Sequence, residues 1–99
     1  MADKSLRWSE RAREENNNLL DYLLNEWGEE ITLRIAEQIE KTASRIQQSP
    51  DQFPIFSKRK HVRRCVLSPQ TSIFFRVYTT EIVIISVFDN RQNPKKRKL

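Results

Sequence analysis

The segment LLDYLLNEWGEEI, residues 19–31, contains the only glycine of the 99-residue chain and decides the fold. Apolar residues recur before this glycine at helical spacing: Ala12, Leu19, Leu20, Leu23, Leu24 and Trp27. Gly28 stands where a helix C-cap is expected, and Glu29-Glu30 suits the first turn of a second helix. A link this short predicts two antiparallel helices that form a hairpin.

The limits of the hairpin can be read outward from Gly28. Ser9 suits an N-cap, and the alternation in Leu6-Arg7-Trp8 before it predicts a short first strand. The second helix ends at Ser49-Pro50. Its apolar stripe consists of Ile31, Ile35, Ala36, Ile39, Ala43 and Ile46. We therefore expect helices at about residues 9–27 and 29–48.

The second half of the chain predicts a sheet. Residues 50–60, PDQFPIFSKRK, are expected to form a loop, with Phe53, Ile55 and Phe56 packed against the core. Strands are predicted at 62–67, 72–78 and 82–88, and the short links between them indicate an antiparallel meander. The near-continuous apolar run of the third strand favours a central position with both faces covered.

These elements together predict one α+β domain over residues 1–99. Its order is an N-terminal strand, an antiparallel helical hairpin and a three-stranded antiparallel meander, followed by a basic tail at 93–99. The apolar faces of the hairpin and the sheet should pack on each other in two layers. The other face of the sheet is then left open.

Charge is distributed unevenly along the chain. Residues 1–56 carry a net charge of −4 and residues 57–99 carry +9, which together give the formal net charge of +5. Such a basic half attracts nucleic acid, a ribonucleoprotein or an acidic protein, unless it is merely a solvated surface. No apolar run is long enough to span a bilayer and no signal-peptide core is present, so we expect a cytoplasmic protein without a membrane partner.

Cysteine and histidine each occur once. Cys65 can form no internal disulfide, and with His61 as the only histidine no Cys-based zinc site can be built. We expect neither a metal nor a cofactor, and we expect Cys65 to be a small buried strand residue rather than a nucleophile.

Five stretches of the sequence carry a resemblance to a known family. They are WSERA at residues 8–12, Trp27-Gly28, Ser49-Pro50, RRCV at 63–66 and FDNRQNP at 88–94. With these stretches and the order of its elements, the chain resembles the RelE/ParE superfamily of type II toxin–antitoxin toxins over nearly its whole length. The resemblance implies a two-layer RelE/ParE-like fold, a bacterial cytoplasmic location and an acidic antitoxin that lays a helix or strand over the basic face.

Two departures from the family bear on activity. Members often have a glycine soon after the proline that ends the second helix, where this chain has Asp51-Gln52-Phe53. Ribosome-dependent ribonucleases of the superfamily often have Tyr or His near the end of the last strand, where this chain has Phe88-Asp89-Asn90.

The resemblance leaves several functions open. One is a ParE-like toxin that poisons DNA gyrase by binding, and another is an endoribonuclease that cleaves mRNA on the ribosome. A degenerate toxin that binds only its antitoxin and a nucleic-acid-binding module without toxicity are further alternatives. The lack of an obvious acid–base pair favours the gyrase poison or the degenerate toxin over the nuclease, whereas the basic half favours the nuclease.

Candidate site residues come from the basic half. Cations around a phosphate stabilise developing charge, and the candidates for catalysis are Arg64, Arg76, Asp89 and Arg91. The candidates for contact with a target or antitoxin are Lys58, Arg59, Lys60, Arg63, Arg64, Arg76, Tyr78 and Arg91. Strand alternation predicts that Arg76 and Tyr78 share the open face. Asp89 is either a general base or, as we favour, an ion-pair partner that fixes Arg91.

Overall fold

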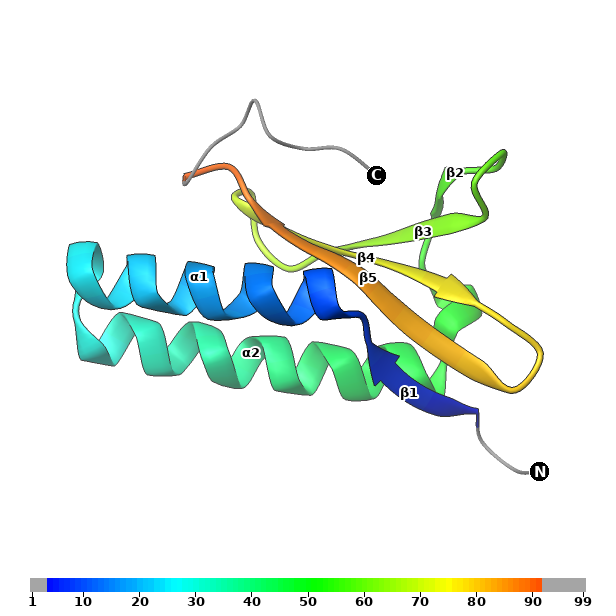
Figure 1. Ribbon diagram of the computed structural model, residues 1–99, viewed down its shortest axis with the longest axis horizontal. Coiled ribbons are helices and arrows are strands. Elements are labelled where there is room, and N and C mark those ends of the chain that lie inside the picture. Colours follow the sequence, from blue (N-terminus) through cyan, green and yellow to red (C-terminus); the bar gives the residue numbers. More distant parts are fainter. Residues whose placement is uncertain (1–3, 92–99) are drawn as a thin grey trace.

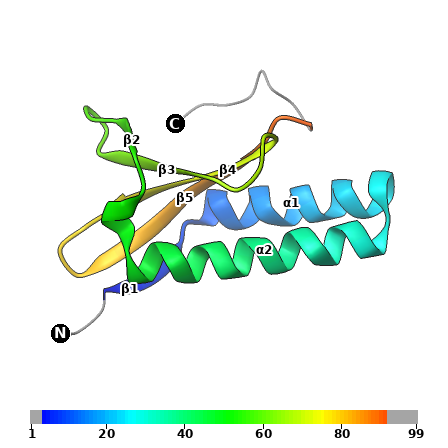
Figure 2. The same ribbon diagram turned by 180° about the vertical axis from the view of Figure 1, so that it is seen from behind.

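The computed structural model describes residues 4–91, so the basic tail at 93–99 lies outside the described residues. In chain order the elements are β1 (Ser5–Trp8), α1 (Glu10–Trp27), α2 (Glu29–Gln48), a 3₁₀ helix (Pro50–Gln52), β2 (Ile55–Ser57), β3 (Val62–Val66), β4 (Thr71–Val77) and β5 (Glu81–Asp89). The helical hairpin lies along one face of the sheet, and no helix among residues 4–91 covers the other face (Figures 1 and 2). The predicted α+β fold class is confirmed.

The two ends of α1 form as the sequence predicts. The Ser9 side chain accepts a hydrogen bond from the backbone N–H of Ala12 at 3.0 Å. Gly28 has φ +88° and its N–H donates to the carbonyl of Leu23 at 3.1 Å, which closes the last turn of α1. The carbonyl of Gly28 in turn accepts from the N–H of Thr32, so one residue links both helices.

We expect Gly28→Ala to destabilise the fold by about 1 kcal/mol, because an L residue is strained at positive φ. A Cβ at this position would meet nothing within 4 Å, so backbone strain is the only cost. Urea unfolding of the variant should show the loss, while Glu26→Ala on the exposed surface of α1 should not. An unchanged midpoint for Gly28→Ala would show that the turn does not require a left-handed residue.

The sheet has five strands in the order β1-β5-β4-β3-β2. The meander of β3, β4 and β5 is antiparallel, as predicted. β1 joins the sheet parallel to β5, with Leu6 opposite Ile82 and Trp8 opposite Ile84, a pairing that the sequence pattern did not assign. β5 is therefore an interior strand, but a helix, α1, covers only one of its faces.

Residues 50–60 are more regular than predicted. The two prolines do not exclude structure there, because Pro50 begins a 3₁₀ helix and Pro54 directly precedes the edge strand β2. Proline is compatible with both positions, since neither needs its missing N–H for a ladder bond. The carbonyl of Pro54 accepts from the N–H of Arg64 at 3.0 Å, which holds the start of β2 against β3.

The main core lies between the hairpin and the sheet. Its fully buried side chains include Leu19 and Leu23 from α1, Ile39 and Ile46 from α2, and Ile73, Phe75, Ile82 and Ile84 from the sheet. Burial of an aliphatic or aromatic side chain of this size contributes about 1.5–3 kcal/mol. This layer fixes the sheet so that alternate residues of each strand face away from the helices.

Four apolar residues that we expected in the core are instead exposed. Leu24 and Trp27 are 49% and 55% exposed because the tip of the hairpin extends beyond the sheet (Figure 1). Ile55 and Phe56 in β2 are 56% and 40% exposed, and of the three apolar loop residues only Phe53 is buried. The helical spacing of apolar residues shows which face of a helix is turned to the core. It does not show how far along the helix the sheet that covers this face extends.

Candidate functional site

The face of the sheet opposite the helices carries a cluster of aromatic rings and arginine. Arg64 in β3 stands opposite Phe74 in β4, and both alternate with core residues. The Phe56 ring packs edge-on against the Phe74 ring with centroids 4.8 Å apart. Phe74 is thus completely buried on the side of the sheet that faces away from the helical hairpin.

The Arg64 guanidinium is held in place by this cluster. Its Nε donates to the Ser72 hydroxyl at 3.1 Å. Its Cζ lies 5.9 Å from the Phe56 ring centroid and 5.8 Å from that of Phe74, within cation–π range. A guanidinium fixed at Nε still has its terminal N–H groups, and these suit a carboxylate or a phosphate.

Arg76 lies further along β4 on the same face. Its Nε is buried and has no hydrogen-bond partner among residues 4–91. Leaving a buried donor unpaired costs about 1–3 kcal/mol, so such groups call for an explanation. The residue as a whole is only half-buried, so a shift of the side chain on binding could bring this donor to an acceptor oxygen of a partner, which makes Arg76 the leading candidate for contact on the open face.

Arg7 extends this face across the sheet and was not among the candidates. Arg7 in β1 and Arg76 in β4 are both in register with Val83 in β5, so the three residues form a row. The Arg7 Nε lies 3.2 Å from the carboxylate of Glu81, and this ion pair raises the pKa of Arg7. The alternation in Leu6-Arg7-Trp8 could have indicated its orientation, but the parallel pairing that places it beside β5 could not be inferred.

Arg91 is bound by a compact network at the end of β5. The Asp89 carboxylate is buried and accepts hydrogen bonds from Arg91 Nε at 2.9 Å, from Arg91 Nη2 at 2.6 Å and from the Thr71 hydroxyl at 2.6 Å. The backbone N–H of Arg91 donates to the same carboxylate, and the Tyr22 hydroxyl donates to the carbonyl of Arg91. This is the geometry of an ion pair that fixes the arginine.

The pKa of Asp89 is lowered although the group is buried. Burial alone would raise the pKa, but the hydrogen bonds from Arg91 and Thr71 and the arginine charge outweigh burial. The same contact raises the pKa of Arg91, chiefly through the hydrogen bond to Asp89. The carboxylate therefore stays ionised near neutral pH, with both oxygens engaged.

The structure separates the predicted site residues into groups. Arg64 and Arg76 share the open face, whereas Arg91 is joined to Thr71, which lies five residues along β4 from Arg76, or about 17 Å at the rise of a strand. Lys58, Arg59 and Lys60 occupy the exposed turn between β2 and β3, and Tyr78 is 45% exposed just beyond β4. Arg63 points to the helix side, where its Nη1 donates to the carbonyl of Phe53 at 2.7 Å.

The described part of the chain offers little support for a metal site, a reactive cysteine or a membrane-spanning helix. No group of three or more His, Cys, Asp or Glu side chains among residues 4–91 could hold a metal ion. Cys65 is buried, and burial raises the pKa of its thiol. Over the same residues, neither helix combines the length and apolar character that a membrane crossing requires.

A family model described as the ParE toxin of the type II toxin–antitoxin system parDE matches residues 6–94. The chain belongs to the ParE toxin family. Its fold agrees with this assignment, because the order of strand, helical hairpin and antiparallel strands is shared with solved toxin structures. The RelE/ParE resemblance of the sequence is thereby confirmed.

Solved structures extend the comparison, whereas no curated protein matches the chain. A chromosomal ParDE toxin–antitoxin system from P. aeruginosa has a chain that is 26% identical, with TM-score 0.76, and the match covers 87% of this chain and 95% of that one. The YoeB dimer of Staphylococcus aureus is 14% identical with TM-score 0.62, covering 88% and 97% of the two chains. The E. coli DinJ–YafQ complex is 5% identical with TM-score 0.63, covering 93% and 98%. The last two show a shared fold alone.

Proposed function

We propose that this ParE-family toxin arrests bacterial growth by binding DNA gyrase through the open face of its sheet. The observation that carries the proposal is the buried Nε of Arg76, which has no partner within residues 4–91 and lies in register with Arg7 across the face. The fixed guanidinium of Arg64 adds a second cation. Gyrase as the target comes from the resemblance to the ParE branch.

The two carboxylates of the basic half favour gyrase binding over RNA cleavage, because both are already engaged by arginines. Cleavage by 2′-hydroxyl attack needs a proton acceptor within reach of the reacting phosphate. Glu81 and Asp89 are the only acidic residues of the basic half, residues 57–99. Glu81 is paired with Arg7, and Asp89 accepts hydrogen bonds from Arg91 and Thr71 at both of its oxygens. A carboxylate with lowered pKa and both oxygens engaged is a poor general base.

An mRNA endonuclease is the second candidate, and the cations favour it. Arg64 and Arg76 on one face could stabilise charge on a cleaved phosphate, with Tyr78 beyond the end of the same strand. A degenerate toxin that binds only its antitoxin would show neither activity. The three candidates differ in what happens to DNA topology and to transcripts, so one experiment separates them.

An acidic antitoxin is the proposed partner in all three cases. The P. aeruginosa ParDE system and the E. coli DinJ–YafQ complex are toxin–antitoxin assemblies. For this chain, the net charge of +9 on residues 57–99 provides the electrostatic complement to an acidic protein. Such complementarity speeds association more than it deepens affinity. We propose that the complex forms in the bacterial cytoplasm.

The proposed function predicts a specific cellular phenotype. Induced expression in a bacterium should stop growth, plasmid DNA should lose negative supercoils, and translated transcripts should stay intact. Co-expression of the small acidic protein encoded beside the toxin gene should restore growth and supercoiling. Gel analysis of plasmid topology and mapping of transcript ends from the same culture measure both effects.

Two results would contradict this prediction. Transcripts cut within translated codons, with normal plasmid topology, would establish the nuclease. Normal growth at high soluble expression would establish the degenerate toxin.

A further inference from the structure

The hairpin tip, residues 24–30, combines exposed apolar side chains with acidic ones. Leu24 and Trp27 are both exposed and lie about one helical turn apart on α1. Residues 14–33 contain six acidic residues and neither lysine nor arginine, and three of the six acidic residues lie in the tip. The tip therefore presents an apolar surface with a negative rim, at the end of the hairpin that extends beyond the sheet (Figure 1).

The open face of the sheet carries the opposite charge beside apolar side chains of its own. Arg7, Arg76 and Arg64 lie on β1, β4 and β3 in turn across this face. The exposed Phe56 ring lies beside Arg64, and the exposed Val66 lies two residues after Arg64 on the same side of β3. The charge and the apolar groups of the face therefore complement those of the hairpin tip.

The residue types on the two surfaces are those that contribute most when protein surfaces bind each other. Tryptophan and arginine are enriched among the residues that dominate the binding energy of interfaces. An indole ring is also the best aromatic partner for a guanidinium. Trp27 at the tip and Arg76, which lies between Arg7 and Arg64 in strand order, therefore form a suitable pair.

A chain cannot place its tip on its own open face. The helical hairpin packs against the other side of the sheet, and its tip extends past the strands (Figures 1 and 2). The main core fixes this arrangement, because Leu19, Leu23 and Ile39 are buried between the two layers. Contact between the two surfaces therefore requires a second copy of the chain.

We propose that copies of the chain associate tip to face, so that Trp27 of one copy contacts Arg76 of the next and covers its open face. Such a contact joins two different surfaces, and it produces either a reciprocal pair or an open chain of copies. Self-association then competes with target binding, so the toxin is masked at high local concentration and released on dilution. This masking rests on the proposed function, whereas the contact itself does not.

Charge argues against the two symmetric alternatives. Two tips placed together would oppose their acidic residues, and two open faces placed together would oppose Arg7, Arg64 and Arg76. Like charges disfavour an interface, whereas the opposite charges of tip and face favour it. Because the end of one hairpin makes a small contact, we expect a dissociation constant of about 10–100 µM at low salt. Raising the salt from about 50 mM to about 500 mM should weaken the association several-fold, because added salt screens the charges.

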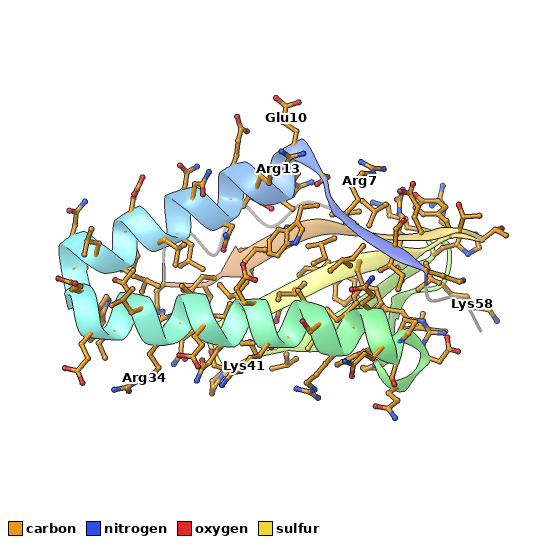
Figure 3. The ribbon with its side chains drawn as sticks, turned by 90° about the horizontal axis from the view of Figure 1, so that it is seen from below. Arg7, Glu10, Arg13, Arg34, Lys41 and Lys58 are labelled. Atoms are coloured by element: carbon orange, nitrogen blue, oxygen red, sulfur yellow. The ribbon has the colours of Figure 1, made fainter. Side chains whose placement is uncertain are left out.

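Sedimentation equilibrium of the purified chain tests the contact. At low salt the wild type should pass from single copies to larger species between about 5 µM and about 200 µM. Trp27→Ala and Arg76→Met should each weaken this association about 10-fold or more. Two matched controls should associate as the wild type does. Ile55→Ala truncates a side chain that is 56% exposed, against 55% for Trp27, and Arg13→Met removes a cation from α1 far from the tip (Figure 3).

A mixture of the two variants tests which surfaces meet. In an equimolar mixture of Trp27→Ala with Arg76→Met, the intact tip of the second variant meets the intact face of the first. We expect one-to-one dimers in the mixture at concentrations where neither variant associates alone. Circular dichroism should show both variants folded, because Trp27 is exposed and Arg76→Met removes an unsatisfied donor.

Two results would overturn the tip-to-face contact. One is a wild type that stays monomeric at the highest concentration, and the other is a mixture of folded variants that stays monomeric while the wild type associates. Both leave the proposed function standing, since gyrase inhibition is measured separately. A wild type that associates but leaves supercoiling unchanged would refute the gyrase target and keep the contact. If the contact masks the open face, Trp27→Ala should inhibit gyrase more strongly than wild type at concentrations where the wild type associates, and equal inhibition would refute the masking.

Discussion

We expect Asp89→Ala to lower the free energy of unfolding by about 3 kcal/mol, because removing one partner of a buried ion pair leaves the other unsatisfied. The Asp89 side chain is completely buried and is bound by the Arg91 guanidinium, the Arg91 backbone and the Thr71 hydroxyl. These contacts fasten the end of β5 to the start of β4. For a domain of this size the loss is a large part of the total stability.

The pH dependence of this effect has a definite sign. The folded-state pKa of Asp89 is lowered, so its contribution is fully present above the ordinary carboxyl pKa of about 4 and is lost as pH falls through the folded value. Urea unfolding at pH 7 and at pH 3 should show a larger difference between wild type and Asp89→Asn at pH 7. Glu30→Ala, which removes an exposed pair with Arg34, is the control and should change stability little. A wild-type-like Asp89→Ala would refute the structural role.

Arg76→Met should abolish growth arrest without weakening the fold. The buried Nε of Arg76 has no partner among residues 4–91, so an apolar chain of similar length removes an unsatisfied donor. We expect the melting temperature to stay level or rise, while target affinity falls about 30-fold or more, as for a central arginine of an interface. This opposite movement of stability and activity is typical of a residue kept for binding.

The control for Arg76→Met is Arg34→Met, which removes one exposed cation of the same charge from α2. It should arrest growth as the wild type does. Equal toxicity of both variants would exclude the open face as the target surface. A marked loss of stability in Arg76→Met would instead assign Arg76 a structural role.

The hairpin could be predicted from sequence because its signals are local. Ser9 caps α1 with its own side chain, and Gly28 takes the positive φ that ends this helix. The alternation of Arg64 and Arg76 with core residues was equally local. In each case, residues close together in the sequence are enough to predict the local structure.

The features that were missed depend on contacts between distant segments. Trp27 lies on the apolar stripe of α1 but is 55% exposed, since the stripe does not show where the sheet ends. Arg7 reaches the open face only through the parallel pairing of β1 with β5. The guanidinium of Arg63, a candidate for contact with a target or antitoxin, binds the carbonyl of Phe53 on the helix side, and this partner does not follow from the local pattern. The order in which strands pair and the extent of the sheet beneath the helices are set only when the whole chain has folded.

An assay with purified gyrase tests most directly whether the open face binds and inhibits this target. Relaxed plasmid, ATP and gyrase are incubated with increasing amounts of wild-type toxin, of Arg76→Met and of Arg34→Met. We expect wild type and Arg34→Met to suppress supercoiling and accumulate cleaved DNA, and Arg76→Met to require about 30-fold more protein for the same effect. Undiminished supercoiling at a large excess of folded wild-type toxin would contradict it.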